Sequence, residues 1–330
     1  MSISWFSRVG SFVLLTASIS ACSGGGGQPA APASSEENAR RVFDLSHRVT
    51  TFLPSADAAP ERRFNADVKR PVGTSRVVAG FQDQAVFVQL PDFPSGDGVF
   101  KLNSIILPEN LGTSVDSASH FVPTKPEVPD PDRRDLSELT VEDLTGPVVF
   151  IDISARVEAE LKKNSGSPGL PTITNFGDAS PSVVTAADID AVADRLANRS
   201  FVIAHTGWSK FWVTSGPGLE GPYVNGFNFP GFSKAAIARL IEIETSRNIR
   251  INGLGADNLA VEVGENANAP TFGPGAFPVH ARGLQRGWKL LENLATTVEL
   301  GRGPCTLYVG ALNHVGGVAS WARVFASCAS

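Results

Sequence analysis

Short apolar runs alternate with longer segments of helical periodicity, and this alternation restricts the possible folds more than any other feature of the chain. Two segments, 186–198 and 234–247, have helical periodicity, and Thr185 and Ser233 precede them as candidate N-caps. The strand-like runs are 77–79, 85–89, 104–107, 148–153, 201–205 and 249–254. Strands interspersed with helices, without internal repeats, predict a sheet-rich α/β domain.

Composition indicates one large domain and argues against nucleic-acid binding. The chain is 42% apolar and 18% charged, which suits a domain of about 290 residues that buries most of its apolar surface. Without residues 1–21 it carries 27 basic and 33 acidic side chains, a net charge of −6. A mildly acidic chain without a basic cluster has little to attract a phosphate backbone, so no nucleic-acid partner is expected.

The N-terminus has the pattern of an export signal. Arg8 precedes a short apolar run at 9–19, which is too brief to span a bilayer permanently and is typical of a cleaved leader. Ile19-Ser20-Ala21-Cys22 resembles a bacterial lipobox, which implies a signal peptide at 1–21. The alternative is an ordinary secretory signal in which the cysteine is incidental.

The residues after the leader predict a tether. Residues 22–39 are rich in Gly, Ala, Pro and Ser and cannot bury a core, so they are expected to be a flexible linker to a domain at 40–330. The resemblance to bacterial lipoproteins implies lipid on Cys22 and a protein exported to the cell envelope. Residue 23 is not aspartate, which by the lipoprotein sorting pattern favours the outer membrane.

Two cysteines remain near the C-terminus, and an exported protein allows them to pair. Residues 305–312 and 321–326 are strand-like, and Gly316-Gly317 between them is a turn signal. A hairpin folded about that Gly-Gly pair places Cys305 opposite Cys328, so we predict a disulfide there. The alternative is two free buried thiols.

Residues 110–120 contain several candidates for metal-binding and catalytic side chains. They read Asn-Leu-Gly-Thr-Ser-Val-Asp-Ser-Ala-Ser-His and resemble H-x-G-T-H-x-D-x-P-x-H, the hallmark of the cyclase family of metal-dependent hydrolases. That family includes kynurenine formamidases and isatin hydrolases. Gly112, Thr113, Asp116 and His120 match the motif. Asn110 and Ser114, however, stand where the family has its first two histidines.

Six further segments resemble the family in the correct order, so that the similarity covers roughly residues 40–328. They are Asp-Leu-Ser-His at 44–47, the strand at 146–152, Thr-Gly-Trp at 206–208, Pro-Gly-Phe-Ser at 230–233, Phe-Pro-Val-His at 277–280 and Leu-Glu-Asn-Leu at 291–294. The resemblance implies the cyclase-family α/β fold, a single domain with a mixed sheet, flanking helices and a C-terminal β-hairpin. It also implies a homodimer as a candidate assembly.

By the same resemblance, Asp116, His280 and Glu292 are the candidate metal ligands and His120 is the candidate catalytic acid or base. The implied reaction is hydrolysis of an amide, cyclic amide or lactone of a small-molecule substrate. A divalent metal, zinc or manganese, acidifies water and polarises the carbonyl in such sites.

The two replaced histidines limit this prediction. An amide oxygen and a hydroxyl are poor substitutes for imidazole on zinc, and oxygen-rich surroundings favour manganese, magnesium or calcium. Three protein ligands still suffice for a single ion. The alternative is a metal-free pseudoenzyme or a lipoprotein that binds a small molecule in the same pocket. A structural lipoprotein without a ligand is a third class.

Each candidate also has a purely structural interpretation. Asp116 and His120 can hydrogen-bond one another or cap backbone groups, and His280 and Glu292 can form a buried polar pair. His205 either lines the pocket or is a satisfied core histidine. Convergence of Asp116, His120, His280 and Glu292 in space is therefore the decisive structural expectation.

Overall fold

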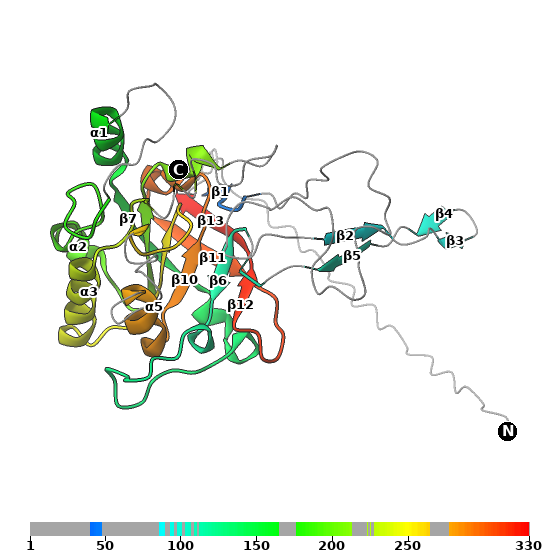
Figure 1. Ribbon diagram of the computed structural model, residues 1–330. Coiled ribbons are helices and arrows are strands. Elements are labelled where there is room, and N and C mark those ends of the chain that lie inside the picture. The colour runs from blue at the N-terminus through cyan, green and yellow to red at the C-terminus, as the bar shows by residue number, and fades with distance from the viewer. Residues whose placement is uncertain are drawn as a thin grey trace, which may run out of the picture. The chain divides into compact units, whose positions relative to one another are not determined.

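In the computed structural model, four parallel strands form the centre of the domain (Figure 1). They are β7 (Thr145–Asp152), β8 (Ser200–His205), β9 (Ile251–Ala256) and β10 (Lys289–Glu292). Along β8, Phe201 and Ile203 pack into one core cluster and Val202 and Ala204 into another. Because both faces of these strands are buried, their sequences are nearly continuous apolar runs, as is usual for parallel strands.

Antiparallel strands extend the sheet on both sides and make it mixed, as predicted. The nine strands run in the order β1-β13-β11-β7-β8-β9-β10-β6-β12. The outer strands are β1 (Arg40–Asp44), β6 (Ser114–Asp116), β11 (Cys305–Gly310), β12 (Ala319–Trp321) and β13 (Arg323–Ala329).

The structure describes residues 40–47, 86–89, 93–95, 98–100, 103–106, 109–110, 112–164, 176–212, 223, 225, 228–264 and 277–329. All of these lie in one compact unit, Asn38–Ser330, which agrees with a single domain. The predicted leader and tether, the lipidation site at Cys22 and the predicted strand at 77–79 lie outside the described residues. No helix in the described ranges is long and apolar enough to cross a membrane.

Two small antiparallel pairs are separate from the large sheet. β2 (Val86–Gln89) pairs with β5 (Asn103–Ile106), and β3 (Phe93–Ser95) pairs with β4 (Gly98–Phe100). The predicted strands at 85–89 and 104–107 correspond to β2 and β5.

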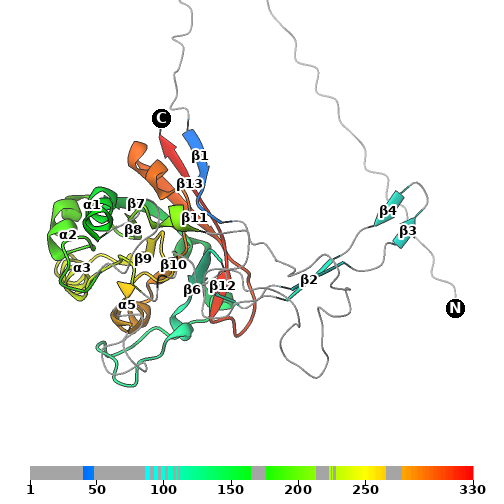
Figure 2. The same cartoon turned by 45° about the horizontal axis from the view of Figure 1, so that its top comes forward.

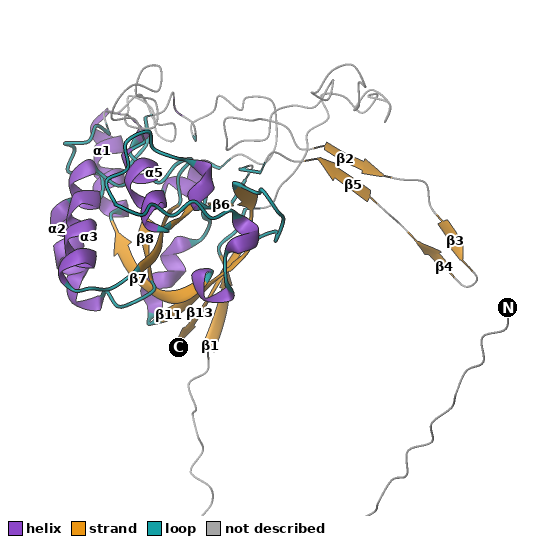
Figure 3. Cartoon of the chain, turned by 90° about the horizontal axis from the view of Figure 1, so that it is seen from below, coloured by secondary structure: helices purple, strands orange, loops and turns teal. Residues whose placement is uncertain are grey.

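The α-helices gather on one side of the sheet (Figures 2 and 3). The α-helices are α1 (Ser154–Asn164), α2 (Ala186–Val192), α3 (Lys234–Ser246) and α5 (Pro278–Gly283). Short 3-10 turns are η2 (Ala118–His120), η3 (Leu136–Glu138), η4 (Val141–Asp143), η5 (Ala193–Arg195), η6 (Trp208–Phe211), η9 (Leu284–Arg286) and η10 (Thr297–Arg302). Apolar residues of α2 and α3 join those of β7 and β8 in one buried cluster, which holds these helices on the sheet.

Both predicted helix caps are present. The Thr185 hydroxyl accepts a hydrogen bond from the amide of Asp188, and the Ser233 hydroxyl accepts one from the amide of Ala236. The first predicted helix is shorter than expected, however, because α2 ends at Val192 and only a 3-10 turn follows. The Arg247 guanidinium donates to carbonyls of that turn region, which replaces the hydrogen bonds of a continued helix.

The C-terminal hairpin has the predicted register. Cys305 of β11 lies opposite Cys328 of β13, and the two form a disulfide. The prediction that 321–326 is one strand was wrong. The chain changes partner at Ala322, whose amide donates to the Thr113 carbonyl, so Trp321 pairs with Ser114 of β6 instead.

Candidate metal centre

Asp116 and Glu292 are brought together by the pairing of β6 with β10. Glu292 lies opposite Ser114 and Leu290 lies opposite Asp116 in this antiparallel pair. Side chains of directly opposed residues point to the same face, and so do residues two apart on a strand. Asp116 and Glu292 are therefore diagonal neighbours on one face of the sheet, and both are buried.

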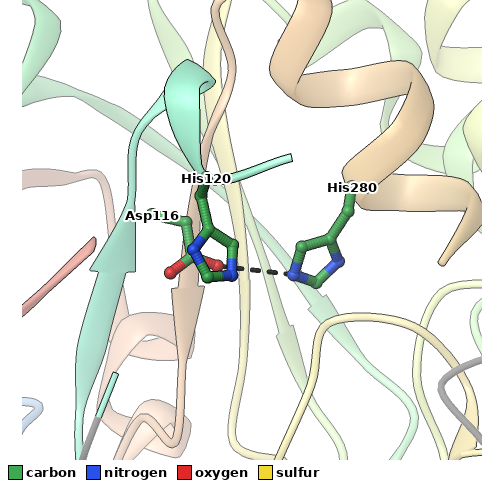
Figure 4. A group of neighbouring side chains, drawn as sticks. All are labelled: Asp116, His120 and His280. Atoms are coloured by element: carbon green, nitrogen blue, oxygen red, sulfur yellow. Dashed lines mark ion pairs between the residues drawn. The ribbon is translucent and has the colours of Figure 1, made fainter. Parts of the chain in front are cut away.

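His280 comes to this face from α5. Its Nε2 atom lies 3.4 Å from Asp116 Oδ2 and 3.6 Å from Glu292 Oε1. Pro278 occupies the first turn of α5, where its missing N–H costs no hydrogen bond and its fixed φ suits a helix start. Figure 4 shows the Asp116 and His280 side chains pointing into the same space.

His120 approaches from η2, the turn that directly follows β6. Its ring centroid lies 5.9 Å from that of His280, and its ligand atom lies within 4.8 Å of those of Asp116 and His280. Asp116 and His120 do not satisfy one another, because Asp116 Oδ1 and Oδ2 and His120 Nδ1 all lack hydrogen-bond partners in the described structure. The four side chains selected from the sequence therefore converge.

A fifth residue, Glu262, belongs to the same cluster and was missed in the sequence analysis. It is fully buried just beyond the end of β9, and one of its oxygens lies 2.7 Å from His280 Nδ1. Together with His280 and Glu292 it forms a second group whose ligand atoms lie within 4.8 Å of one another. The available signal was a single glutamate in the otherwise apolar run Leu259-Ala260-Val261-Glu262-Val263.

Unsatisfied polar atoms concentrate at this cluster. Ten buried side-chain nitrogen or oxygen atoms of the described residues lack a hydrogen-bond partner. Six of these belong to this one site: Ser114 Oγ, Asp116 Oδ1 and Oδ2, His120 Nδ1, Glu262 Oε2 and Glu292 Oε1. Buried polar atoms normally have partners, so their grouping around one imidazole indicates a bound polar species or ion.

The charges of the cluster also require compensation. Burial raises the pKa of Glu292 well above its ordinary value, and the neighbouring Asp116 carboxylate raises it further. Burial alone lowers the pKa of His280, but the Glu262 charge and the contact with Asp116 outweigh it and hold this pKa well above the ordinary value. Without a cation, protons must neutralise part of the negative charge.

The donor set fits a divalent ion. It offers three carboxylates and two imidazoles, a mixture of oxygen and nitrogen donors that suits manganese. A donor set with fewer imidazoles would suit magnesium. Ser114 supplies a buried hydroxyl where the family motif has a histidine, whereas Asn110 is only partly buried. Oxygen donors thus dominate the centre.

His205 lies outside this cluster. Its Nδ1 atom bonds the Thr297 hydroxyl at 2.8 Å and lies 3.5 Å from Asp257 Oδ2. Asp257 is fully buried and also accepts hydrogen bonds from the amide and hydroxyl of Thr206. His205 is therefore a satisfied histidine, which agrees with the structural interpretation of this residue.

Aromatic side chains adjoin the centre. The His47 ring stacks on Trp212 with centroids 4.0 Å apart, and Trp212 meets Tyr223 edge to face. The backbone amide of His47 donates to Thr113, the neighbour of Ser114. Burial raises the pKa of Tyr223 well above its ordinary value, and the Asp257 and Glu292 charges raise it further. This region supplies an apolar wall beside the charged cluster.

A mixed sheet therefore brings together buried carboxylates and imidazoles that could hold a metal ion. The family model Cyclase, described as "Putative cyclase", matches residues 43–263. The chain therefore belongs to the cyclase family.

Solved structures of isatin hydrolases share the fold. One of them, bound to the product analogue thioisatinate, is 20% identical to this chain with a TM-score of 0.59. The match covers 88% of this chain and 93% of the isatin hydrolase chain. Isatin hydrolase A from Labrenzia aggregata, bound to benzyl benzoate, is 22% identical (TM-score 0.55; 88% and 94% covered). The Ralstonia solanacearum enzyme is 19% identical (TM-score 0.56; 88% and 92% covered). No curated protein matches the chain.

Proposed function

We propose that this protein is a divalent-metal hydrolase that cleaves an amide, cyclic amide or lactone of a small molecule. The observation that carries the proposal is the group of six unpartnered polar atoms around His280, because three buried carboxylates need a cation or protons to be stable. Membership of the cyclase family and the fold shared with isatin hydrolases support hydrolysis as the type of reaction.

In this proposal Asp116, His280 and Glu292 hold the ion, which supplies an acidified water and a polarised carbonyl when bound. His120 is the proton carrier. It lies beside the cluster on a short turn, its Nδ1 atom is unpartnered, and a histidine there can accept a proton from water and return it to the leaving group. The edge-to-face pair of Trp212 and Tyr223 forms an apolar surface beside the cluster.

Manganese is the proposed metal. Carboxylates outnumber imidazoles in the cluster, and the Ser114 hydroxyl replaces a nitrogen ligand of the family motif. Carboxylate-rich donor sets suit manganese by ligand type, although zinc binds most sites more tightly, so manganese is bound where it is the more available ion.

The direct experiment is metal analysis of protein purified without chelator, followed by hydrolysis assays with a formanilide, a lactam and a lactone in the presence of Mn²⁺ or Zn²⁺. His120→Ala is expected to retain the metal and lose at least about 100-fold in turnover. The matched control is His314→Ala, because His314 is paired with Glu109 and belongs to neither group of candidate ligands. Full activity of His120→Ala contradicts the assigned role.

A metal-free binding protein is the competing function. The raised pKa values of Glu292 and His280 favour it, because protons can neutralise the cluster without an ion. Purified protein that contains no metal, takes up none and still binds a formanilide or lactam supports this alternative.

We also propose that the mature protein is anchored by lipid on Cys22 in the bacterial cell envelope. The support is the lipobox-like Ile19-Ser20-Ala21-Cys22 and the tether-like composition of 22–39. Incorporation of labelled fatty acid, compared between the natural chain and Cys22→Ser, tests the proposal. Equal labelling of both chains contradicts it.

A further inference from the structure

Glu262 makes an unusual double contact with His280. A single carboxylate oxygen, Oε1, accepts hydrogen bonds from the backbone amide of His280 at 2.8 Å and from its ring Nδ1 at 2.7 Å. Glu262 and its partner are both buried, so neither contact competes with bulk water. The second oxygen, Oε2, has no partner among the described residues.

The backbone fixes Glu262 in place for this contact. The Glu262 backbone forms a parallel bridge with Phe232, and a Cβ atom on Gly231 would lie only 2.2 Å from the Glu262 carbonyl oxygen. Only glycine therefore permits so close an approach of these two segments. The bridge with Phe232 holds the Glu262 carboxylate in place, and the first turn of α5 holds the His280 imidazole against it.

This geometry determines which ring nitrogen of His280 carries a proton. A carboxylate oxygen can only accept, so Nδ1 must be the protonated nitrogen in the neutral ring. The lone pair of neutral His280 is then on Nε2, the atom 3.4 Å from Asp116 and 3.6 Å from Glu292. Nε2 is the nitrogen that faces the other candidate ligands.

We propose that Glu262 is a positioning residue that fixes the orientation and tautomer of His280, so that Nε2 is presented as a strong ligand to the ion. The inference rests on the proposed metal-dependent function and adds a residue to it. A carboxylate hydrogen-bonded to the distal nitrogen makes an imidazole more basic, and loss of such a partner typically weakens metal binding 10–100-fold.

The variant that isolates the charge is Glu262→Gln. Its amide oxygen can still accept from Nδ1, so the tautomer is retained while the negative charge is lost. We expect full-length Glu262→Gln, stripped with chelator, to bind Mn²⁺ about 10–100-fold more weakly than the natural chain. Glu262→Ala removes the acceptor as well and is expected to bind more weakly still.

Glu244→Gln is the matched control. Glu244 is a half-buried carboxylate outside the cluster that, like Glu262, accepts two hydrogen bonds on one oxygen, here from Ile251 N and Trp288 Nε1. This variant is expected to bind Mn²⁺ as the natural chain does. If the weaker binding came only from a general loss of stability when a carboxylate charge is removed, Glu244→Gln would show it as well.

The outcomes separate the inference from the proposed function. If the natural chain takes up no Mn²⁺ by isothermal titration, the metal-dependent function fails. If it binds and Glu262→Gln binds equally well, Glu262 has no positioning role.

A measurement on the natural chain does not depend on the folding of any variant. Nitrogen-15 NMR of the histidine rings in the Zn²⁺-loaded protein is expected to show His280 protonated at Nδ1 and bound through Nε2. The opposite assignment overturns the inference.

Discussion

His280 Nε2 lies 3.4 Å from Asp116 Oδ2, although β6 and α5 are far apart in the sequence. The contact is an ion pair in a buried site that also contains Glu262 and Glu292. Burial raises the pKa of Glu292 well above its ordinary value and the Asp116 charge raises it further, so the cluster needs a cation or protons to be stable.

Asp116→Asn is therefore expected to have opposite effects on metal binding and on stability. Loss of the charge should weaken Mn²⁺ binding by at least about 100-fold, because a ligand is removed. In the presence of chelator the same variant should be more stable than the natural chain by roughly 1 kcal/mol, because repulsion of Glu292 is relieved. Thermal unfolding with chelator and with Mn²⁺ measures both effects.

Asp130→Asn is the control for this pair of measurements, since Asp130 is exposed and remote from the cluster. Asp130→Asn should change neither the Mn²⁺ affinity nor the stability in the presence of chelator. An Asp116→Asn protein that Mn²⁺ stabilises as much as the natural chain would exclude Asp116 as a ligand.

Metal binding should release protons and strengthen as the pH rises. In the metal-free cluster, burial and the neighbouring Asp116 charge hold the pKa of Glu292 well above its ordinary value. For His280, burial lowers the pKa but the Glu262 and Asp116 contacts more than offset this, so it too stays well above its ordinary value. An ion must displace these protons, which changes the apparent affinity by up to about tenfold per pH unit for each proton released.

Calorimetric titration of Mn²⁺ in buffers of different ionisation enthalpy measures the released protons directly. We expect a release greater than one proton near pH 6 and a smaller one at higher pH. An affinity that is the same at pH 6 and pH 8 would mean that the ligands are already deprotonated in the metal-free protein.

His47 should make the fold sensitive to acid. Burial lowers the pKa of His47 to about 4, whereas the unfolded chain has a value of about 6.5. Between these values the unfolded state binds the proton and the folded state does not. The contribution of His47 is therefore present above pH 6.5 and is lost as the pH falls towards 4, by roughly 2–3 kcal/mol.

His47→Phe tests this effect, because phenylalanine can keep the ring contact with Trp212 but cannot titrate. The free energy of unfolding of the natural chain should fall relative to that of the variant between pH 6.5 and pH 4.5. His314→Phe provides the contrast: the hydrogen bond to Glu109 raises the pKa of His314, so this variant should lose a contribution that is present at acid pH and should not remove the acid sensitivity. Parallel curves for His47→Phe and the natural chain would contradict the assignment.

The disulfide should stabilise the edge of the sheet without serving the reaction. Cys305 and Cys328 are directly opposed on β11 and β13 and enclose a sequence separation of 23 residues. Chain entropy predicts a loss of about 3 kcal/mol when a loop of this length is opened. The double variant Cys305→Ala with Cys328→Ala should show this loss in urea unfolding and retain its Mn²⁺ affinity. An equal loss of metal affinity would indicate that the hairpin shapes the centre.

The sequence predicted those features of this fold that depend on local chemistry. The caps at Thr185 and Ser233 follow from side chains that accept from first-turn amides, and the hairpin register follows from the Gly316-Gly317 turn. The convergence of Asp116 with His280 was expected only through the family motif, since no local pattern relates β6 to α5.

The missed features depend on tertiary contacts. Glu262 contributes through a close approach of two backbones at Gly231, which no periodicity reveals. The early end of α2 depends on Arg247, which lies at the C-terminal end of α3 and whose guanidinium donates to the Ala193 carbonyl. β6 has only three residues, too few to show an alternating pattern.

Lys289 should make the stability of the fold rise with pH above neutrality. It is 1% exposed, and burial lowers its pKa to about 7 although Asp143 lies 3.6 Å away and raises it. The unfolded chain keeps this proton up to about pH 10.5. Between pH 7 and pH 10.5 the unfolded state therefore binds more protons, so the free energy of unfolding increases with pH in this window.

Lys289→Met removes the buried amine while Arg134 and Arg250 still pair with Asp143. We expect the variant to be more stable than the natural chain by roughly 1 kcal/mol at pH 7, because an ammonium is no longer buried. The natural chain gains up to about 1.4 kcal/mol per pH unit in this window, so the difference should shrink above pH 7 and reverse by pH 9. Urea unfolding at pH 7, 8 and 9 measures it. The control is Lys125→Met, an exposed site that should not alter the pH dependence. A variant that is less stable than the natural chain at every pH would show that the Lys289–Asp143 attraction exceeds the desolvation of the amine.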